Sequence, residues 1–507
     1  MDDVVPFAAS LGIVCLVGLL AVLSNRVSAR LRVPAPAFFL VGAAAASDLV
    51  PALGALDITT VQRIVTVALL VILFDGGMHI GAARFRSAAG AIVWLGVAGT
   101  VVTAVAAAAA AHWVFGFDWY LALLLGTALA PTDPAVVFSV LGRREISGPS
   151  GTLLEGESGA NDPVGIAMLV AILSAGGAAG WGAVGTGVGV FALQMIVGAV
   201  VGVVGGRALL VFMRAVPLPS EGLYPLRVLA SAGVVFGVAS VLQGSGFLAV
   251  FVAGIVVGDE RAPYKREIER FHSALASLAE IVAFTLLGLT VQLKTLPDGE
   301  AWVIGLVLAA LIAFVVRPLL VGLVLWPVRL ARNERVFVLW AGLKGAVPVL
   351  LGTYILTTHD PGALRVYDVV FVVVLFSVVV SGGLVPWLAT RLRLPMRVVE
   401  PEPWALGLRF RDEPQGLHRY TVAAGAAADG ATLADLPMGE NAWVSMVSRA
   451  GALLQVRGGT ALEAGDEVLV LADPNVADEV GGLFTGAAPS AGPSGPGVGG
   501  VPVGGEG

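Results

Sequence analysis

The chain has 507 residues, of which 57% are hydrophobic and 13% are charged, with a formal net charge of −6. Soluble domains carry about twice this charged fraction, so the composition excludes an ordinary soluble protein and predicts a polytopic membrane protein. The acidic balance also excludes a basic surface for nucleic acid.

Thirteen apolar stretches approach the length of a membrane-spanning helix, which is about 20 residues. The first follows Asp2 and Asp3 without a basic region, so we expect a retained span and not a cleaved signal peptide. We expect spans near residues 4–25, 33–50, 59–80, 88–114, 118–141, 152–175, 183–213, 224–242, 245–258, 268–293, 301–328, 335–357 and 366–390. Together they predict a transmembrane domain over residues 1–395.

Basic residues are distributed unevenly between the loops. Every second loop is rich in arginine and lysine, whereas the opposite set holds only Arg63, Lys294 and Arg365. Because basic loops stay on the cytoplasmic side, the N-terminus is expected outside and everything after residue 390 in the cytoplasm. We therefore expect a multi-pass protein of the inner (plasma) membrane.

Two spans are interrupted near their middle. Proline disrupts the fifth at residues 130–134 (Ala-Pro-Thr-Asp-Pro), and glycine and proline disrupt the twelfth at 344–348 (Lys-Gly-Ala-Val-Pro). Unwound backbone at membrane depth is tolerated where it is buried or lines a cavity. The breaks lie seven spans apart, which is typical of inverted repeats whose crossing broken helices surround a midplane binding site.

The sixth span carries Glu157, Asn161 and Asp162 within an apolar segment. A charge at membrane depth costs about 3 kcal/mol or more and marks an ion or proton pathway. Burial favours the protonated form of Asp162 and a bound cation favours the ionised form. Proton and cation therefore compete for one carboxylate, and exchange should fall at acid pH.

Four further charges have electrostatic explanations. Arg317 cannot lose its proton and needs an anion, for which Glu157 is the best candidate. Broken helix ends carry partial charges of about half an electron. Asp133 can neutralise two positive N-terminal ends, and Lys344 two negative C-terminal ends.

These segments resemble the monovalent cation:proton antiporters, in the sodium/proton-exchanger branch. The resemblance rests on four motifs in order: Thr132-Asp133-Pro134, Glu157-Ser158 with Asn161-Asp162, Arg317-Pro318, and 342–347 (Gly-Leu-Lys-Gly-Ala-Val). It covers roughly residues 5–395. It implies a homodimer, in which each protomer has a rigid dimerisation domain and a core that moves vertically to expose the site to alternate sides. The Asn-Asp pair implies electroneutral exchange.

The resemblance also implies roles for single residues. Asp162 would bind the cation or the proton, Thr132 and Ser158 would supply neutral oxygen ligands to the monovalent cation, and Asn161 would brace the site. Two departures are Lys344, where the family usually has arginine, and Glu280, where an uncharged residue is expected.

Other interpretations remain open, both for single residues and for the function of the chain. Asp75 belongs either to the access funnel or to a helix-end cap, and Glu280 is assigned to a cavity on the access pathway. The G-x-S-G pattern at residues 156–159 is typical of intramembrane serine proteases, but no histidine lies mid-span to activate Ser158. A cation channel is the other alternative, although one titratable site with paired breaks favours alternating access. We predict a secondary transporter and not an enzyme, with no cofactor, because no Walker or dinucleotide motif is present.

The composition changes after Arg397. A linker at 396–402 is expected to lead into a small cytoplasmic α+β domain at 403–485, with strands at 418–424, 442–448, 453–456 and 467–472 and helices near 432–436 and 475–483.

Residues 458–470 resemble the C-terminal lobe of potassium-conductance regulator domains (TrkA-C-like). This implies either a site for a small cytosolic ligand or a passive dimerisation module, and favours potassium over sodium. The other outcome is a sodium- or lithium-selective exchanger with a purely structural tail. Residues 486–507 are expected to be disordered.

Overall fold

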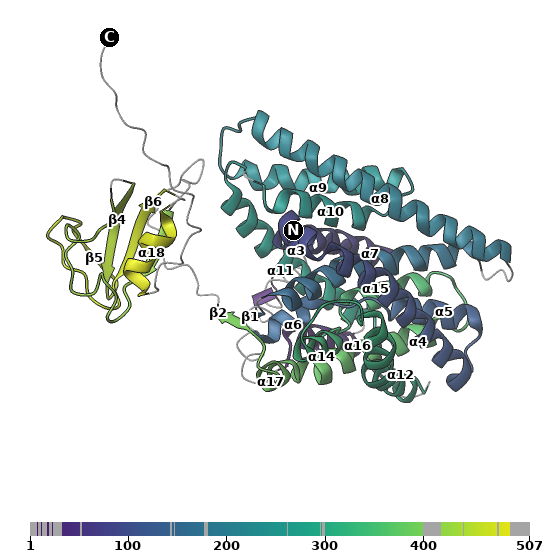
Figure 1. Ribbon diagram of the computed structural model, residues 1–507. Coiled ribbons are helices and arrows are strands. Elements are labelled where there is room, and N and C mark those ends of the chain that lie inside the picture. The colour runs from purple at the N-terminus through teal and green to yellow at the C-terminus, as the bar shows by residue number, and fades with distance from the viewer. Residues whose placement is uncertain are drawn as a thin grey trace, which may run out of the picture. The chain divides into compact units, whose positions relative to one another are not determined.

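A computed structural model describes residues 33–50, 53–141, 144–146, 148–176, 181–260, 262–294, 296, 300–398, 417–439, 441–473 and 476–486, with a few isolated positions before residue 33. The chain divides into two units, Met1–Leu406 and Gly407–Gly507. The first is almost entirely helical and the second contains a sheet (Figure 1). This agrees with the predicted helical membrane protein with a small α+β domain.

The helical unit follows the apolar pattern of the sequence. Its helices are α2 (Ala35–Leu49), α3 (Ile58–Trp94), α4 (Thr100–Phe115), α5 (Trp119–Ala128), α6 (Pro134–Leu141), α7 (Pro149–Ala175), α8 (Trp181–Ala215), α9 (Leu223–Val241), α10 (Gly246–Gly258), α11 (Lys265–Leu289), α12 (Ala301–Leu311), α13 (Gly322–Val324), α14 (Arg332–Trp340), α15 (Ala346–Leu356), α16 (Ala363–Phe376) and α17 (Val385–Arg391). Wider π-helical turns join α3 to α4 (Leu95–Gly99), α12 to α13 (Ile312–Val321) and α16 towards α17 (Ser377–Gly382).

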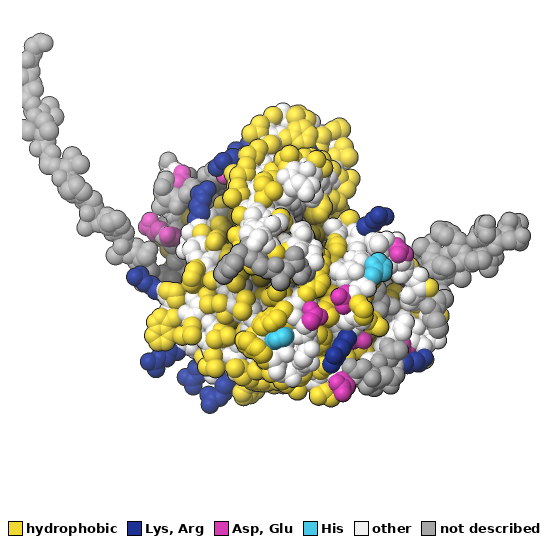
Figure 2. Space-filling view, turned by 90° about the vertical axis from the view of Figure 1, so that its right-hand side faces the viewer, with side chains coloured by type: hydrophobic (Ala, Val, Ile, Leu, Met, Phe, Trp, Pro, Cys, Tyr) yellow, Lys and Arg dark blue, Asp and Glu magenta, His cyan; other side chains and the backbone are white. Residues whose placement is uncertain are grey.

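The predicted spans from residue 33 onward coincide with these helices to within a few residues. Within the described residues, seven helical segments are long and apolar enough to cross a membrane, and four shorter apolar helices accompany them. Figure 2 shows one face of the molecule, on which apolar side chains are widespread, as expected of a surface in contact with lipid. The first predicted span, 4–25, lies largely outside the described residues, so the count of thirteen stays a prediction.

Both predicted interruptions are present as gaps between short helices. Residues 129–133 separate α5 from α6, and residues 341–345 separate α14 from α15. These four helices have 10, 8, 9 and 11 residues, and a span needs about 20. Each pair therefore makes one span only when its two halves are taken together.

A short antiparallel ladder lies at the end of the helical unit. Strand β1 (Arg144–Ile146), between α6 and α7, pairs with β2 (Met396–Val398), which follows the last helix. The first residues of the predicted linker are thus held by the loop that precedes α7.

The second unit has its own sheet and its own core. Strands β3 (Leu417–Thr421), β4 (Ala442–Arg449), β5 (Ala452–Leu454) and β6 (Glu467–Ala472) form an antiparallel sheet in the order β3-β6-β4-β5, followed by α18 (Ala477–Thr485). Apolar side chains of the sheet and of α18, among them Val447, Val468 and Phe484, are fully buried together. The four strands and the last helix lie close to their predicted positions.

The predicted helix at 432–436 is wrong. The backbone N–H groups of Leu433 and Ala434 donate to the carbonyls of Thr460 and Gly458, at 3.0 and 2.8 Å. Pairing with a distant segment takes the donors that a helix would need. The predicted disordered segment, 486–507, lies outside the described residues except for Gly486.

Candidate functional site

The two helix interruptions contact each other. The backbone N–H of Asp133 donates to the carbonyl of Leu343 at 2.8 Å. In the other direction, the Lys344 Nζ donates to the carbonyls of Ala130 and Pro131 at 2.9 and 3.1 Å. Non-helical backbone from two distant segments is therefore brought together among buried residues.

Asp133 lies at the start of two helices. Its carboxylate accepts the N–H of Ala135 at 2.9 Å, in the first turn of α6, and it is also hydrogen bonded to the backbone of Ala346, where α15 begins. Both helix ends carry partial positive charge, which a carboxylate stabilises. Gly345 makes this approach possible, since a Cβ built there would overlap the Asp133 carboxylate.

The C-terminal ends of α5 and α14, which carry partial negative charge, have different cationic partners. Lys344 contacts the carbonyls just after α5, whereas Arg317 donates from Nε to Leu339 O and from Nη2 to Val338 O, both at 3.1 Å, in the last turn of α14. The expectation that Lys344 serves both ends is therefore corrected: Arg317 takes the second. The Lys344 N–H is held by the hydroxyl of Ser377 at 2.8 Å.

Arg317 also forms a buried ion pair with Glu157. Its Nη1 lies 2.9 Å from Glu157 Oε1, and 4% of each side chain is exposed. Arg317 stands in the π-helical segment Ile312–Val321, which contains Pro318. Proline lacks the N–H of a regular helix, and π turns are frequent at functional sites. This widened turn directs the guanidinium to α7 and α14 at once.

Thr132 is braced from α7. Asn161 donates from Nδ2 to Thr132 Oγ1 at 2.7 Å, and its Oδ1 accepts the Thr132 N–H at 3.3 Å. The Ser158 hydroxyl donates to the Thr132 carbonyl. The unwound residue Thr132 is thereby hydrogen bonded at its amide, its hydroxyl and its carbonyl, so its position follows that of α7.

Asp162 stands beside this cluster with spare acceptor capacity. It is 6% exposed, and its Oδ1 is buried without a hydrogen-bond partner among the described residues. Asp162 interacts electrostatically with Asp133 and Lys344. A buried carboxylate oxygen without a donor is costly unless it takes up a proton or a cation. Among the described residues no group of three His, Cys, Asp or Glu side chains forms a polyvalent metal site.

The two residues assigned to the access pathway lie elsewhere. Asp75 accepts a hydrogen bond from Ser273 of α11 at 3.1 Å and lies 3.4 Å from His79. Glu280, on α11, has a buried Oε1 without a partner in the described part of the chain and interacts electrostatically with Asp133. Glu280 belongs to α11, and the partners of Asp75 come from α3 and α11.

Sequence reasoning did not single out Ser377, and it used Gly345 only as part of the interruption and its motif. The signal for Ser377 was a hydroxyl within the apolar run 366–390, and the signal for Gly345 was its place beside Lys344. Neither signal reveals the partner, because Ser377 holds a residue 33 positions away.

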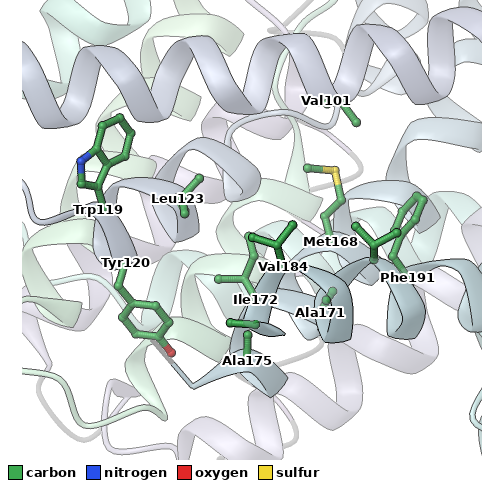
Figure 3. A pocket seen from close by; sticks show the side chains of 13 residues that line it. Val101, Trp119, Tyr120, Leu123, Met168, Ala171, Ile172, Ala175, Val184 and Phe191 are labelled. Carbon is green, nitrogen blue, oxygen red and sulfur yellow. The ribbon is translucent and has the colours of Figure 1, made fainter. Parts of the chain in front are cut away.

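An apolar cavity between the helices is not the ion site. Its volume is about 520 Å³, and it lies between α4, α5, α7 and α8. Figure 3 shows Trp119, Tyr120, Met168 and Phe191 on its walls, and none of the described residues that line it is charged. An apolar cavity cannot replace the hydration shell of a cation, so the polar cluster around Asp162 remains the candidate site.

Comparison with known proteins decides the family. Residues 15–391 match the family described as "Sodium/hydrogen exchanger, transmembrane", and residues 417–485 match the TrkA-C domain. The chain belongs to the sodium/hydrogen exchanger family. As a member of this family it is a secondary cation/proton antiporter of the membrane and not an enzyme.

Individual relatives of this antiporter carry names that agree with this family. It is 35% identical to the K(+)/H(+) antiporter NhaP of Alkalimonas amylolytica over 384 residues. The aligned region covers 74% of this chain and 65% of that relative. It is 31% identical to the K(+)/H(+) antiporter NhaP2 of Shewanella oneidensis over 92% of this chain and 82% of that protein. The fold matches the sodium proton antiporter MjNhaP1 of Methanocaldococcus jannaschii with a TM-score of 0.63 and 21% identity. The match covers 74% of this chain and 99% of that one.

Proposed function

We propose that the antiporter exchanges potassium for protons by competition of the two ions for Asp162. The observation that supports this most is the Asp162 carboxylate oxygen, which is buried without a partner among the described residues and follows Asn161, the residue bonded to Thr132. Thr132, Ser158 and Asp162 would supply the oxygen ligands of the cation, and Asn161 would hold Thr132 in place. Oxygen ligands suit hard monovalent cations.

Charge balance favours electroneutral exchange. Three neighbouring buried charges have compensating partners: Glu157 has Arg317, and Asp133 and Lys344 have helix ends. When Asp162 exchanges its proton for the cation, one proton leaves as one cation arrives. Glu280 and Asp75 would lie on the path by which ions reach the site.

The choice of potassium rests on two associations. The TrkA-C domain resembles potassium-conductance regulators, and the relatives above are named K(+)/H(+) antiporters. Against this, a relative named Na(+)/H(+) antiporter NhaH, from Halobacillus aidingensis, is 26% identical over 63% of this chain. A sodium- and lithium-selective exchanger is therefore the second candidate.

The alternating-access cycle would use the two contacting helix interruptions. We infer thirteen spans in two inverted repeats, an outer N-terminus, a cytoplasmic tail and a homodimer in the inner membrane, with a small cytosolic ligand on the TrkA-C domain. A serine protease is disfavoured because the Ser158 hydroxyl donates to a backbone carbonyl, whereas His79, His112 and His272 are hydrogen bonded to backbone carbonyls elsewhere.

Proton flux in proteoliposomes that carry a pH gradient tests the proposal. Potassium, sodium or lithium is added to wild type and to Asp162→Asn. Dissipation of the gradient by potassium that is lost in the variant supports the potassium antiporter. Dissipation by sodium and lithium alone would select the second candidate. Flux that survives in Asp162→Asn would contradict the role of this carboxylate.

A further inference from the structure

Helix α3 is interrupted at one residue. Gly81 has φ +66° and ψ 166° inside an otherwise helical segment, which divides α3 into residues 58–80 and 82–94. Side chains of the L-configuration rarely adopt this backbone conformation. A glycine is therefore required at this point for the chain to turn as it does.

The two parts of α3 have different neighbours. Before the interruption, Gly77 lies so close to α10 that an added Cβ would be 3.0 Å from the Ile255 nitrogen and 3.1 Å from the Gly254 Cα. After it, Ile92 fills the space beside Gly156 of α7, the helix that carries Asp162. The first part of α3 thus packs against α10 and the second against α7.

The ends exposed by the interruption are both satisfied by side chains. Asp259, at the end of α10, accepts the N–H of Ala83, and its carboxylate occupies the space that a Cβ on Gly81 would take. Arg84 donates from Nε to the Ile80 carbonyl at 3.1 Å, and its Nη1 lies 3.6 Å from Glu155 of α7. Interrupted helices leave such donors and acceptors unpaired, so these contacts hold the bend without a continuous helix across it.

We propose that Gly81, capped by Asp259, is a joint at which α3 bends when α7 and the ion site change position relative to α10. Asp259 is then a positioning residue for exchange. This inference rests on the proposed alternating-access function. Motions of this kind are absorbed by a few residues at the ends of helical segments. The side-chain contacts of Asp259 and Arg84 with the backbone keep the ends together while the dihedral angles of Gly81 change.

The test compares transport with cation binding in four variants. Gly81→Ala places a methyl group against Asp259 and disfavours the required φ, and Asp259→Ala removes the cap. Asp259→Asn keeps an acceptor oxygen for the Ala83 N–H. Gly90→Ala is the matched control, because it lies in the same helix with no atom within 4 Å of the added Cβ. Maximal exchange rate, apparent KM and the cation-induced shift in melting temperature are measured for each.

We expect Gly81→Ala and Asp259→Ala to lower the maximal rate about tenfold or more, with apparent KM and the cation-induced shift within about twofold of wild type. Asp259→Asn and Gly90→Ala should transport like wild type. If Gly81→Ala does not fold, the joint is tested by comparing Asp259→Ala with Asp259→Asn in the same measurements.

Wild-type maximal rates in Gly81→Ala and Asp259→Ala would overturn the joint and leave the antiporter intact. A loss of rate that is matched by loss of the cation-induced shift would also overturn it, because the residues would then serve the structure of the site. A wild-type protein without cation-dependent proton flux would instead overturn the proposed function on which the joint rests.

Discussion

Glu157 of α7 and Arg317, 160 positions later, form an ion pair of 2.9 Å from which solvent is almost entirely excluded. Arg317 also holds the carbonyls at the end of α14. The pair therefore ties the helix that bears Asp162 to one of the two interrupted spans.

Removal of one partner of this pair should be costly. Glu157→Gln leaves a buried guanidinium without its anion, and we expect a loss of about 3–5 kcal/mol in stability, seen as a lower melting temperature of the purified protein. Arg214→Ala is the control, since its pair with Glu260 at 2.7 Å is about half exposed and should contribute about 0–1 kcal/mol. Equal losses in the two variants would contradict the assigned importance of burial.

Gly345→Ala should damage the contact between the interruptions. The added methyl group would overlap the Asp133 carboxylate, and an overfilled site of this kind costs about 1–3 kcal/mol. We expect a lower melting temperature and strongly reduced exchange. Gly42→Ala, where the added Cβ meets no atom within 4 Å, should behave as wild type. Normal exchange in Gly345→Ala would show that Asp133 does not need this close approach.

The TrkA-C domain should lose stability in acid through one carboxylate. Asp466 accepts two hydrogen bonds of 2.8 Å from Arg449, which hold its pKa below the ordinary value of 3.8. A carboxylate with a lowered pKa in the folded state stabilises fully above its unfolded pKa, and this contribution is lost as the pH falls through the folded value.

The isolated fragment 407–507 should accordingly melt at a lower temperature below about pH 4. Asp466→Asn should lower its melting temperature by a few degrees at neutral pH and flatten the acid dependence. Asp435→Asn, whose carboxylate accepts from Thr432 at the surface, is the control. An acid dependence unchanged in Asp466→Asn would contradict the assignment.

Removal of residues 400–507 should leave exchange in place and alter its regulation. The truncated chain retains β2, which pairs with β1 ahead of α7, so the helical unit keeps its contacts. Proton flux is measured for both chains over a range of pH and potassium concentrations. Complete loss of exchange in a well-folded truncation would make the tail part of the transport machinery.

The sequence predicted what local chemistry determines. Proline and glycine located both interruptions, and the cost of a buried arginine pointed to Glu157. Contacts between distant segments could not be predicted from the sequence in the same way. The division of helix ends between Lys344 and Arg317 depends on a π-helical turn, and residues 432–436 lose their helix to hydrogen bonds with 458–460. Gly81 is one of 66 glycines, and nothing local links it to Asp259.

The most direct test of competition at Asp162 is proton release on cation binding. Potassium is added to purified protein in weakly buffered detergent solution, at a pH where the empty site is protonated. The account predicts release of about one proton per bound cation, with none in folded Asp162→Asn. Cation binding without proton release, or equal release in the variant, would contradict it.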